Sequence, residues 1–153
     1  ILSWAEDYIF RVYGVSIIER TLTETINGTG ISKLFTNKGD IASISSLIVS
    51  DETIDTSLLK FNKNTIFYKD NTFASGTFNV DIVYKVGYAT SDLVPKGLIN
   101  ALFVIGRKMY TDETKNFDAY ASISSDTKQS VKLIDSIPTL ADNLLQAYRI
   151  FRL

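Results

Sequence analysis

The chain contains no cysteine and no histidine among its 153 residues. Without cysteine it has no disulfides, thiolate nucleophiles or cysteine metal ligands, which fits a reducing compartment. Without histidine it lacks the usual general base near neutral pH and the commonest metal ligand. Hydrolytic triads that depend on histidine and the familiar zinc sites are therefore excluded, and the composition disfavours catalysis.

An excess of charge of either sign is also absent. The chain has 16 basic and 17 acidic residues, a formal net charge of −1, so no overall field attracts nucleic acid or an anionic membrane. No apolar run approaches the roughly 20 residues that a membrane-spanning helix needs. Because 45% of the residues are hydrophobic, the length and composition predict a single folded domain with a core and no membrane partner.

Three pairs of adjacent carboxylates are the candidate catalytic or metal-binding groups: Glu6-Asp7, Asp51-Glu52 and Asp112-Glu113. Neighbouring residues on a helix do not share a face, and solvation explains such pairs without any chemistry. The segment from Asp51 to Asp55 has neither the central glycine nor the final glutamate of a calcium loop. We therefore expect no catalytic residue, no metal and no cofactor.

Apolar residues at helical spacing between Leu2 and Tyr13 predict a first helix over about residues 1–14 that ends at Gly14. Because this pattern begins at Ile1 rather than at a methionine, we expect an N-terminal segment to precede it. Residues 16–88 have the alternation and turn residues of a β block. The expected strands are Ser16–Ile26, which leads into a tight Asn27-Gly28 turn, Ser32–Phe35, Ile41–Ser50, Thr65–Lys69 and Asn79–Tyr88.

The last of these strands has the clearest pattern. Its apolar face comprises Val80, Ile82, Tyr84, Val86 and Tyr88, and alternation of this kind is typical of an antiparallel strand with one buried side. The short segments on either side of it join through polar, turn-like residues. We therefore expect one antiparallel β region between the first and second helices.

Pro95 suits the first position of a second helix, expected over about residues 95–111. Its apolar stripe comprises Ile99, Leu102, Phe103, Gly106, Met109 and Tyr110. Thr111–Ile137 lacks a sustained period and is expected to be a long loop, in which Ser130–Ile134 could form a short strand. Pro138 opens a third helix over about 138–152, with a stripe of Leu140, Leu144, Leu145, Tyr148 and Phe151.

Strands that are grouped together, rather than alternating with helices, favour the α+β class. We expect a small helix bundle with an antiparallel β insertion between the first and second helices.

The segment VYKVGYATSDLVPKGLINALFVIGRKMY, from Val83 to Tyr110, has a strand, a Gly-Tyr pair, a proline and an amphipathic helix in succession. It resembles the corresponding segment of the head–tail connector (adaptor) proteins of long-tailed bacteriophages and related prophages. The helix that ends near Tyr13-Gly14, and the segments TINGTG, GTFNV and IPTLADNLLQAYRIF, are consistent with that family. The chain departs from the family at Gly39-Asp40-Ile41, where many members carry Pro-Ile, and it lacks the usual residues ahead of the first helix.

The resemblance implies a structural virion protein without enzymatic activity, a connector domain over residues 1–153. Such proteins form a ring, usually of twelve copies, below the portal at the head–tail interface. The ring extends the channel, through which DNA passes without sequence-specific binding, and it is the platform for the stopper or tail. The implied partners are further copies of the chain, the portal protein and a stopper or tail-completion protein, and the implied site of synthesis is the host bacterial cytoplasm.

By the same resemblance, the C-terminal residues Tyr148, Arg149, Phe151 and Arg152 would contact the portal or a neighbouring subunit. Aromatic residues and arginine are enriched at interfaces, which agrees with this role. Alternatively, Tyr148 and Phe151 pack within the bundle and the two arginines face water.

Two other functions stay open. The protein could be a stopper or tail-completion component of the same neck. It could also be a small enzyme that depends on carboxylates or tyrosine, which predicts a concave pocket that gathers several ionisable groups with shifted pKa values.

Overall fold

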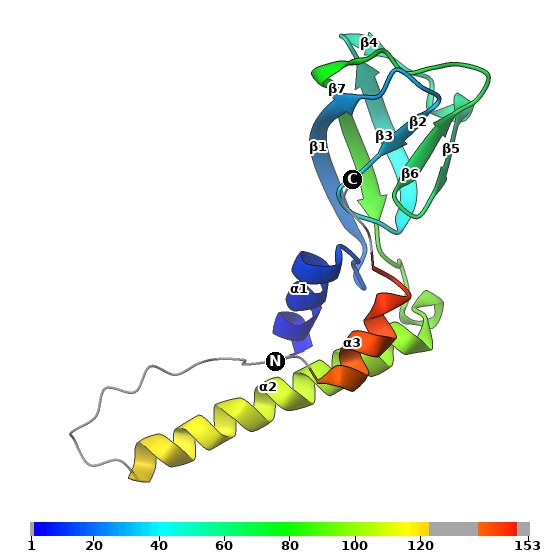
Figure 1. Ribbon diagram of the computed structural model, residues 1–153. Helices are drawn as coiled ribbons and strands as arrows, with labels where there is room; N and C mark the ends of the chain where they lie inside the picture. The colour runs from blue at the N-terminus through cyan, green and yellow to red at the C-terminus, as the bar shows by residue number, and fades with distance from the viewer. Residues whose placement is uncertain (1, 123–137, 150–153) are drawn as a thin grey trace.

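Three helices at one end and two antiparallel sheets at the other make up the computed structural model, which describes residues 2–122 and 138–149 (Figure 1). The helices are α1 (Leu2–Tyr13), α2 (Lys96–Ser122) and α3 (Thr139–Gln146). The strands are β1 (Arg20–Gly28), β2 (Lys33–Phe35), β3 (Ile41–Val49), β4 (Glu52–Thr53), β5 (Leu59–Asn62), β6 (Thr65–Tyr68) and β7 (Gly76–Val86). All strands lie between α1 and α2, so the α+β class and the β insertion are confirmed.

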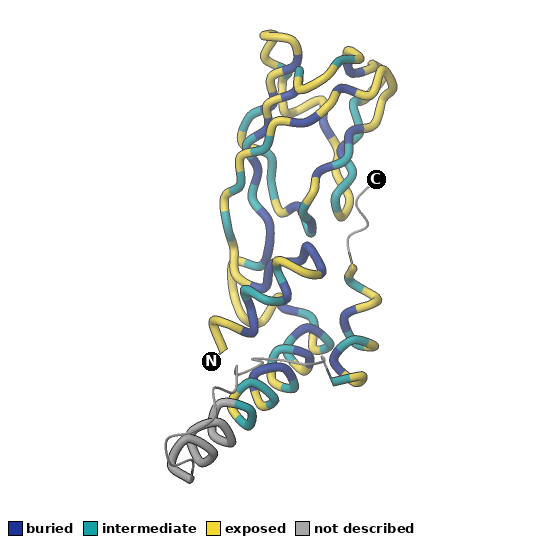
Figure 2. Tube along the Cα trace, turned by 60° about the vertical axis from the view of Figure 1, so that its left-hand side comes forward, coloured by how far each residue is buried: buried dark blue, intermediate teal, exposed yellow. Residues whose placement is uncertain are grey.

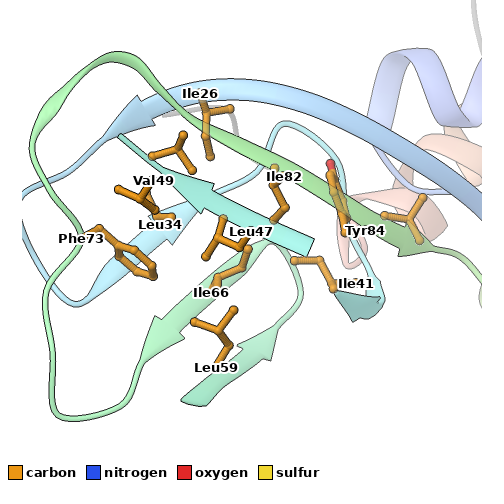
Figure 3. Packing of buried hydrophobic residues seen from close by; sticks show 12 residues of the cluster. Ile26, Leu34, Ile41, Leu47, Val49, Leu59, Ile66, Phe73, Ile82 and Tyr84 are labelled. Atoms are coloured by element: carbon orange, nitrogen blue, oxygen red, sulfur yellow. The ribbon is translucent and has the colours of Figure 1, made fainter. Parts of the chain in front are cut away.

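The four-stranded sheet has the order β1-β7-β3-β4 and the three-stranded sheet the order β2-β6-β5. As the alternation predicts, Val80, Ile82, Tyr84 and Val86 of β7 are fully buried. They join buried residues of both sheets in one hydrophobic cluster, the β core. Figure 3 shows Leu47 of the four-stranded sheet and Ile66 of the three-stranded sheet close together in this core.

The expected tight turn at Asn27-Gly28 is wrong, because both residues belong to the end of β1, which pairs with β7 rather than with the next strand. The Asn27 side chain accepts a hydrogen bond from the backbone N–H of Phe78 at 2.8 Å. The backbone N–H of Gly28 donates to the side chain of Asn79 at the same distance. The register of β1 shifts at this point, and side-chain hydrogen bonds hold the irregular pair in place.

The β5 strand lies entirely in a segment that the sequence pattern assigns to no strand. It forms a hairpin with β6, in which Asn62 pairs with Thr65 and Lys63 has a φ of 52°. A lysine in the left-handed region gives no turn signal in the sequence, since glycine and asparagine are the usual residues there. The short β4 strand was not expected either.

In the helical part, α1 and α3 both pack against α2 (Figure 1). The line of α2 that they cover contains Leu98, Ala101 and Ile105, whereas Phe103 and Tyr110, which the predicted stripe includes, are 58% and 57% exposed. Figure 2 shows buried and exposed positions alternating along this helix. The stripe was wrong at Phe103 and Tyr110 because α2 carries apolar residues on two faces, so periodicity alone does not select the packed one.

The helix bounds differ from the expected ones at two C-termini. Helix α2 continues to Ser122, beyond the expected end near 111, because no glycine or proline interrupts residues 107–122. Helix α3 ends at Gln146, after which the N–H of Tyr148 donates to the carbonyl of Leu145 in a tighter turn. The strand expected over Ser130–Ile134 lies outside the described residues. No helix in the described part of the chain is long and apolar enough to span a bilayer.

Candidate functional site

A pocket that gathers ionisable groups is what the enzyme hypothesis requires. One hollow among the described residues has a volume of about 310 Å³ and lies at the far end of the β block. It is lined by Val49, Ser50, Glu52, Ile54, Tyr68, Asn71, Thr72, Phe73 and Ala74. Its single carboxylate, Glu52, is exposed and has neither a lysine nor a second acid beside it in the lining. This arrangement offers no acid–base pair.

A second, open hollow of about 410 Å³ shares Tyr68 with the first and adds Asp70. The tyrosines whose pKa is raised, namely Tyr8, Tyr13, Tyr84 and Tyr88, line neither hollow. Within residues 2–122 and 138–149, no group of three histidines, cysteines or carboxylates comes close enough to hold a metal ion. These two hollows therefore do not gather the ionisable groups with shifted pKa values that the enzyme hypothesis predicts.

The joint between the helices and the β block contains the buried carboxylate of Glu6. Glu6 is 3% exposed and forms an ion pair with Arg20 at the start of β1. Its Oε1 also accepts a hydrogen bond from the backbone N–H of Ile17 at 3.3 Å. A buried charge is tolerated only when it is paired and hydrogen-bonded, so these contacts hold α1 against the entry to the β block.

Phe10, on the next turn of α1, extends this joint. The Arg20 guanidinium lies 4.6 Å from the centre of the Phe10 ring, and the Lys38 ammonium lies 4.4 Å from it. Lys38 also donates to the backbone carbonyl of Phe10 at 2.7 Å. Two cations on one ring, in addition to the Glu6 ion pair, connect α1 to two separate segments of the β block.

The return path of the chain from β7 to α2 passes through Gly87 and Tyr88. Gly87 has a φ of 86°, and a Cβ there would lie 2.3 Å from the carbonyl oxygen of Ile18 on the outgoing path. Ile18 and Tyr88 form a β-bridge, so the two paths lie side by side. The Tyr88 hydroxyl donates to Asp40 at 3.0 Å, and burial together with this carboxylate raises the pKa of Tyr88. Only glycine permits so close a crossing.

A further hydrogen bond connects the first and third helices. The Tyr13 hydroxyl donates to the Asp142 carboxylate at 2.6 Å, and the Gln146 amide donates to the same oxygen at 3.1 Å. Burial first, and then the hydrogen bond to Asp142, raise the pKa of Tyr13. The contact closes the bundle across α1 and α3.

Of the four C-terminal residues named from the sequence, the structure describes two. Tyr148 is partly buried against the helical core, and its hydroxyl would lie 2.9 Å from a Cβ placed on Gly97 in the first turn of α2. Arg149 is exposed. Phe151 and Arg152 lie outside the described residues.

Two exposed helix faces have the composition of interaction surfaces. The α2 outer face consists of Lys96, Asn100, Phe103, Arg107 and Tyr110, all of them exposed. The α1 outer face consists of Ser3, Trp4, Asp7 and Arg11, with Trp4 59% exposed. Sequence reasoning missed both faces, although the spacing of 4, 3, 4 and 3 residues along α2 marks one side of a helix.

No known protein family matches the sequence, and no curated protein is significantly similar to it. The fold, however, matches solved structures. The neck of a native gene transfer agent (GTA) particle with C12 symmetry contains a chain that superposes with a TM-score of 0.62 at 13% identity, over 99% of this chain and 81% of that one. The neck of an empty GTA particle with C6 symmetry contains a chain that superposes with a TM-score of 0.62 at 14% identity, over 99% of this chain and 77% of that one. This chain therefore shares its fold with chains of these particle necks.

A third similar chain comes from the virion of a native gene transfer agent (GTA) particle, with a TM-score of 0.59 at 12% identity, covering 99% and 76%. The likeness therefore includes the helices and the β block together. Such low identities leave the shared fold as the finding, with no shared residue-level site.

Proposed function

We propose that the protein is a structural component of a virion neck, specifically a head–tail connector (adaptor) of a bacteriophage or prophage. In this role it forms a ring below the portal, extends the DNA channel and provides the platform for the stopper or tail. The observation that carries the proposal is the fold shared with chains of particle necks over 99% of this chain. The resemblance of Val83–Tyr110 to the connector family supports it independently.

Ring formation agrees with the physical character of the chain. A head-to-tail contact that closes into a ring requires two different patches on each subunit. The α1 and α2 outer faces supply two such patches, and the C12 symmetry of one matching neck suggests twelve copies. A formal charge of −1 suits a channel wall along which DNA slides without being held.

The portal or neighbour contact is proposed for the C-terminal residues Tyr148, Arg149, Phe151 and Arg152. Tyr148 is partly buried beside the first turn of α2, and Arg149 next to it is exposed. Arginine and phenylalanine are frequent anchors in buried interface cores.

The proposal is tested by co-expressing the full chain with the portal protein of the same genome, followed by native mass spectrometry and electron microscopy of the purified complex. The expected result is a ring of this protein on one end of the portal. A matched variant that lacks residues 150–153 should lose portal binding but keep its fold. A protein that never associates with the portal would contradict the proposal.

A related experiment distinguishes the connector role from the stopper role. A stopper or tail-completion protein should ignore the isolated portal and bind only when a connector ring is already in place. Adding the protein to portal alone and to a portal–connector complex from the same particle therefore distinguishes the two roles.

A further inference from the structure

The two outer faces of the helical part lie on different helices, and each is the side of its helix opposite the residues that are buried in the helical core. Helix α1 buries Ala5, Ile9 and Tyr13 in the helical core, so its outer face is turned away from α2. Helix α2 buries Leu98, Ala101 and Ile105 in the same core. Among the described residues, α1 and α3 pack on α2 (Figure 1), and the five residues of the α2 outer face stay exposed.

The α2 outer face is aromatic and cationic. Phe103 and Tyr110 are seven residues apart, so they lie on one side of the helix, with Arg107 between them. Lys96 and Arg107 are the two charges of this face, and no acid accompanies them. Its five residues extend over about 21 Å of helix, at 1.5 Å per residue. Arginine, tyrosine and phenylalanine anchors of this kind carry most of the binding energy in interfaces.

The α1 outer face has the complementary groups. The exposed Trp4 ring is a site for a guanidinium, since arginine binds over aromatic rings. The Asp7 carboxylate is 42% exposed and pairs with Arg11 at 2.7 Å, which leaves accepting positions on its oxygens for a second cation. Trp4 and Asp7 are three residues apart and so lie near one another on the helix surface.

Pairing of the α2 outer face with itself would be unfavourable. Lys96 and Arg107 of one copy would face the same cations of the other, with no carboxylate on the face to offset them. When the α1 outer face is the partner, the same cations meet an aromatic ring and a carboxylate, and the one cation of that face, Arg11, is already paired with Asp7. The contact that the charges favour is therefore between unlike faces, which is the kind that generates rings.

We propose that, in the ring, the α2 outer face of each subunit packs against the α1 outer face of the next subunit, with Arg107 placed over Trp4 and beside Asp7. This inference rests on the proposed function, because it assigns the subunit interface of that ring. The occupant of each face is another copy of this chain. The joint residues Glu6, Phe10 and Arg20 are not part of either face.

The absence of native cysteine permits a direct test with the full chain, both free and bound to the portal. Ser3→Cys and Asn100→Cys introduce one thiol on each face without removing an anchor, since both positions are exposed. With a short bismaleimide, the double variant should give a ladder of covalent oligomers. Each single variant should stay monomeric on a denaturing gel, and a mixture of the two single variants should give dimers and nothing larger.

A second measurement addresses the anchors. Phe103→Asp and Trp4→Asp should each weaken self-association about 30-fold or more, as loss of an interface anchor does. An equimolar mixture should form one-to-one pairs, since each variant retains the face that the other lacks. Phe78→Asp is the matched control, because Phe78 is 71% exposed but lies on β7, and it should leave the ring intact.

The possible outcomes are distinct. Rings that survive both anchor substitutions, or cross-linking of a single-cysteine variant to itself, would overturn the interface and leave the connector role standing. A wild-type chain that forms no oligomer, either free or with the portal, would overturn the interface and the connector role together. Circular dichroism of each variant establishes that the fold is retained.

Discussion

Replacing Gly87 with alanine tests the close crossing of the two chain paths at the joint. A φ of 86° costs an alanine about 1 kcal/mol. The new Cβ would also lie 2.3 Å from the Ile18 carbonyl oxygen and 3.1 Å from that of Ser16. These backbone atoms cannot retreat freely, because the Ser16 hydroxyl donates to the same Ile18 carbonyl at 2.6 Å and Ile18 bridges Tyr88. We expect a total loss of about 3 kcal/mol in the free energy of unfolding.

The measurement is urea unfolding followed by circular dichroism, in which the midpoint reports the change in stability when the slope is constant. In a thermal scan the same loss corresponds to a decrease of roughly 6–12 °C in Tm for a chain of this size. Gly30→Ala is the control, because Gly30 also has a positive φ, of 73°, but its Cβ would lie 3.3 Å from the Ser75 Cβ in an exposed loop. It should lose about 1 kcal/mol. Equal losses in the two variants would refute the crossing as the cause.

Three further substitutions have defined outcomes. Tyr13→Phe removes the hydrogen bond to Asp142 and should lose about 1 kcal/mol in a urea titration near neutral pH. Burial holds the pKa of Tyr13 above its ordinary value of 10. The contribution of Tyr13 to the free energy of unfolding is therefore complete below pH 10 and is lost as the pH rises above 10, so the stability of Tyr13→Phe should fall less steeply there than that of the wild type. Parallel decreases in stability for the two proteins would contradict this cause. Tyr84→Phe leaves the Glu24 carboxylate without its 2.8 Å donor and should lose about 1–2 kcal/mol, whereas an unchanged urea midpoint would show that the bond adds nothing. Leu98→Ala opens a cavity where the three helices meet and should lose about 3 kcal/mol by thermal unfolding, while a loss below about 1 kcal/mol would mean that the core closes around the gap.

The parts of the fold that local patterns determine could be predicted from the sequence. The first helix ends before Gly14, which has a φ of 77°, as its glycine suggests. The alternation of β7 identified its buried face because one side of that strand packs on the β core. The order of helices and strands followed from these patterns, and the α+β class followed from the order.

The errors have a common physical origin in contacts between distant segments. Asn27-Gly28 is a strong turn pair in isolation, but hydrogen bonds with residues 78 and 79 keep it in a strand. The packed side of α2 depends on where α1 and α3 lie, and no pattern within α2 contains that information. The pairing of β1 with β7 and the packing of α1 and α3 on α2 therefore determine features that local sequence propensity does not.

The candidate surfaces were less predictable than the fold. The role of Glu6 depends on Arg20 and on the N–H of Ile17, which no local pattern in α1 announces. The α2 outer face became apparent only when Leu98 and Ala101 were seen to be buried instead of Phe103. The portal contact of the C-terminal residues stays a prediction, for which Arg149 is the described residue that faces solvent.

The side-by-side crossing at Ile18 and Tyr88 also has an evolutionary consequence. Since the chain leaves the helices and returns to them at adjacent points, the β block is attached like an inserted module whose two ends are already close together. A block attached in this way can be lengthened, shortened or exchanged at little cost to the helices, because the distance that it must span does not change. Chains that share this fold can therefore differ in the β block while the helical framework stays the same.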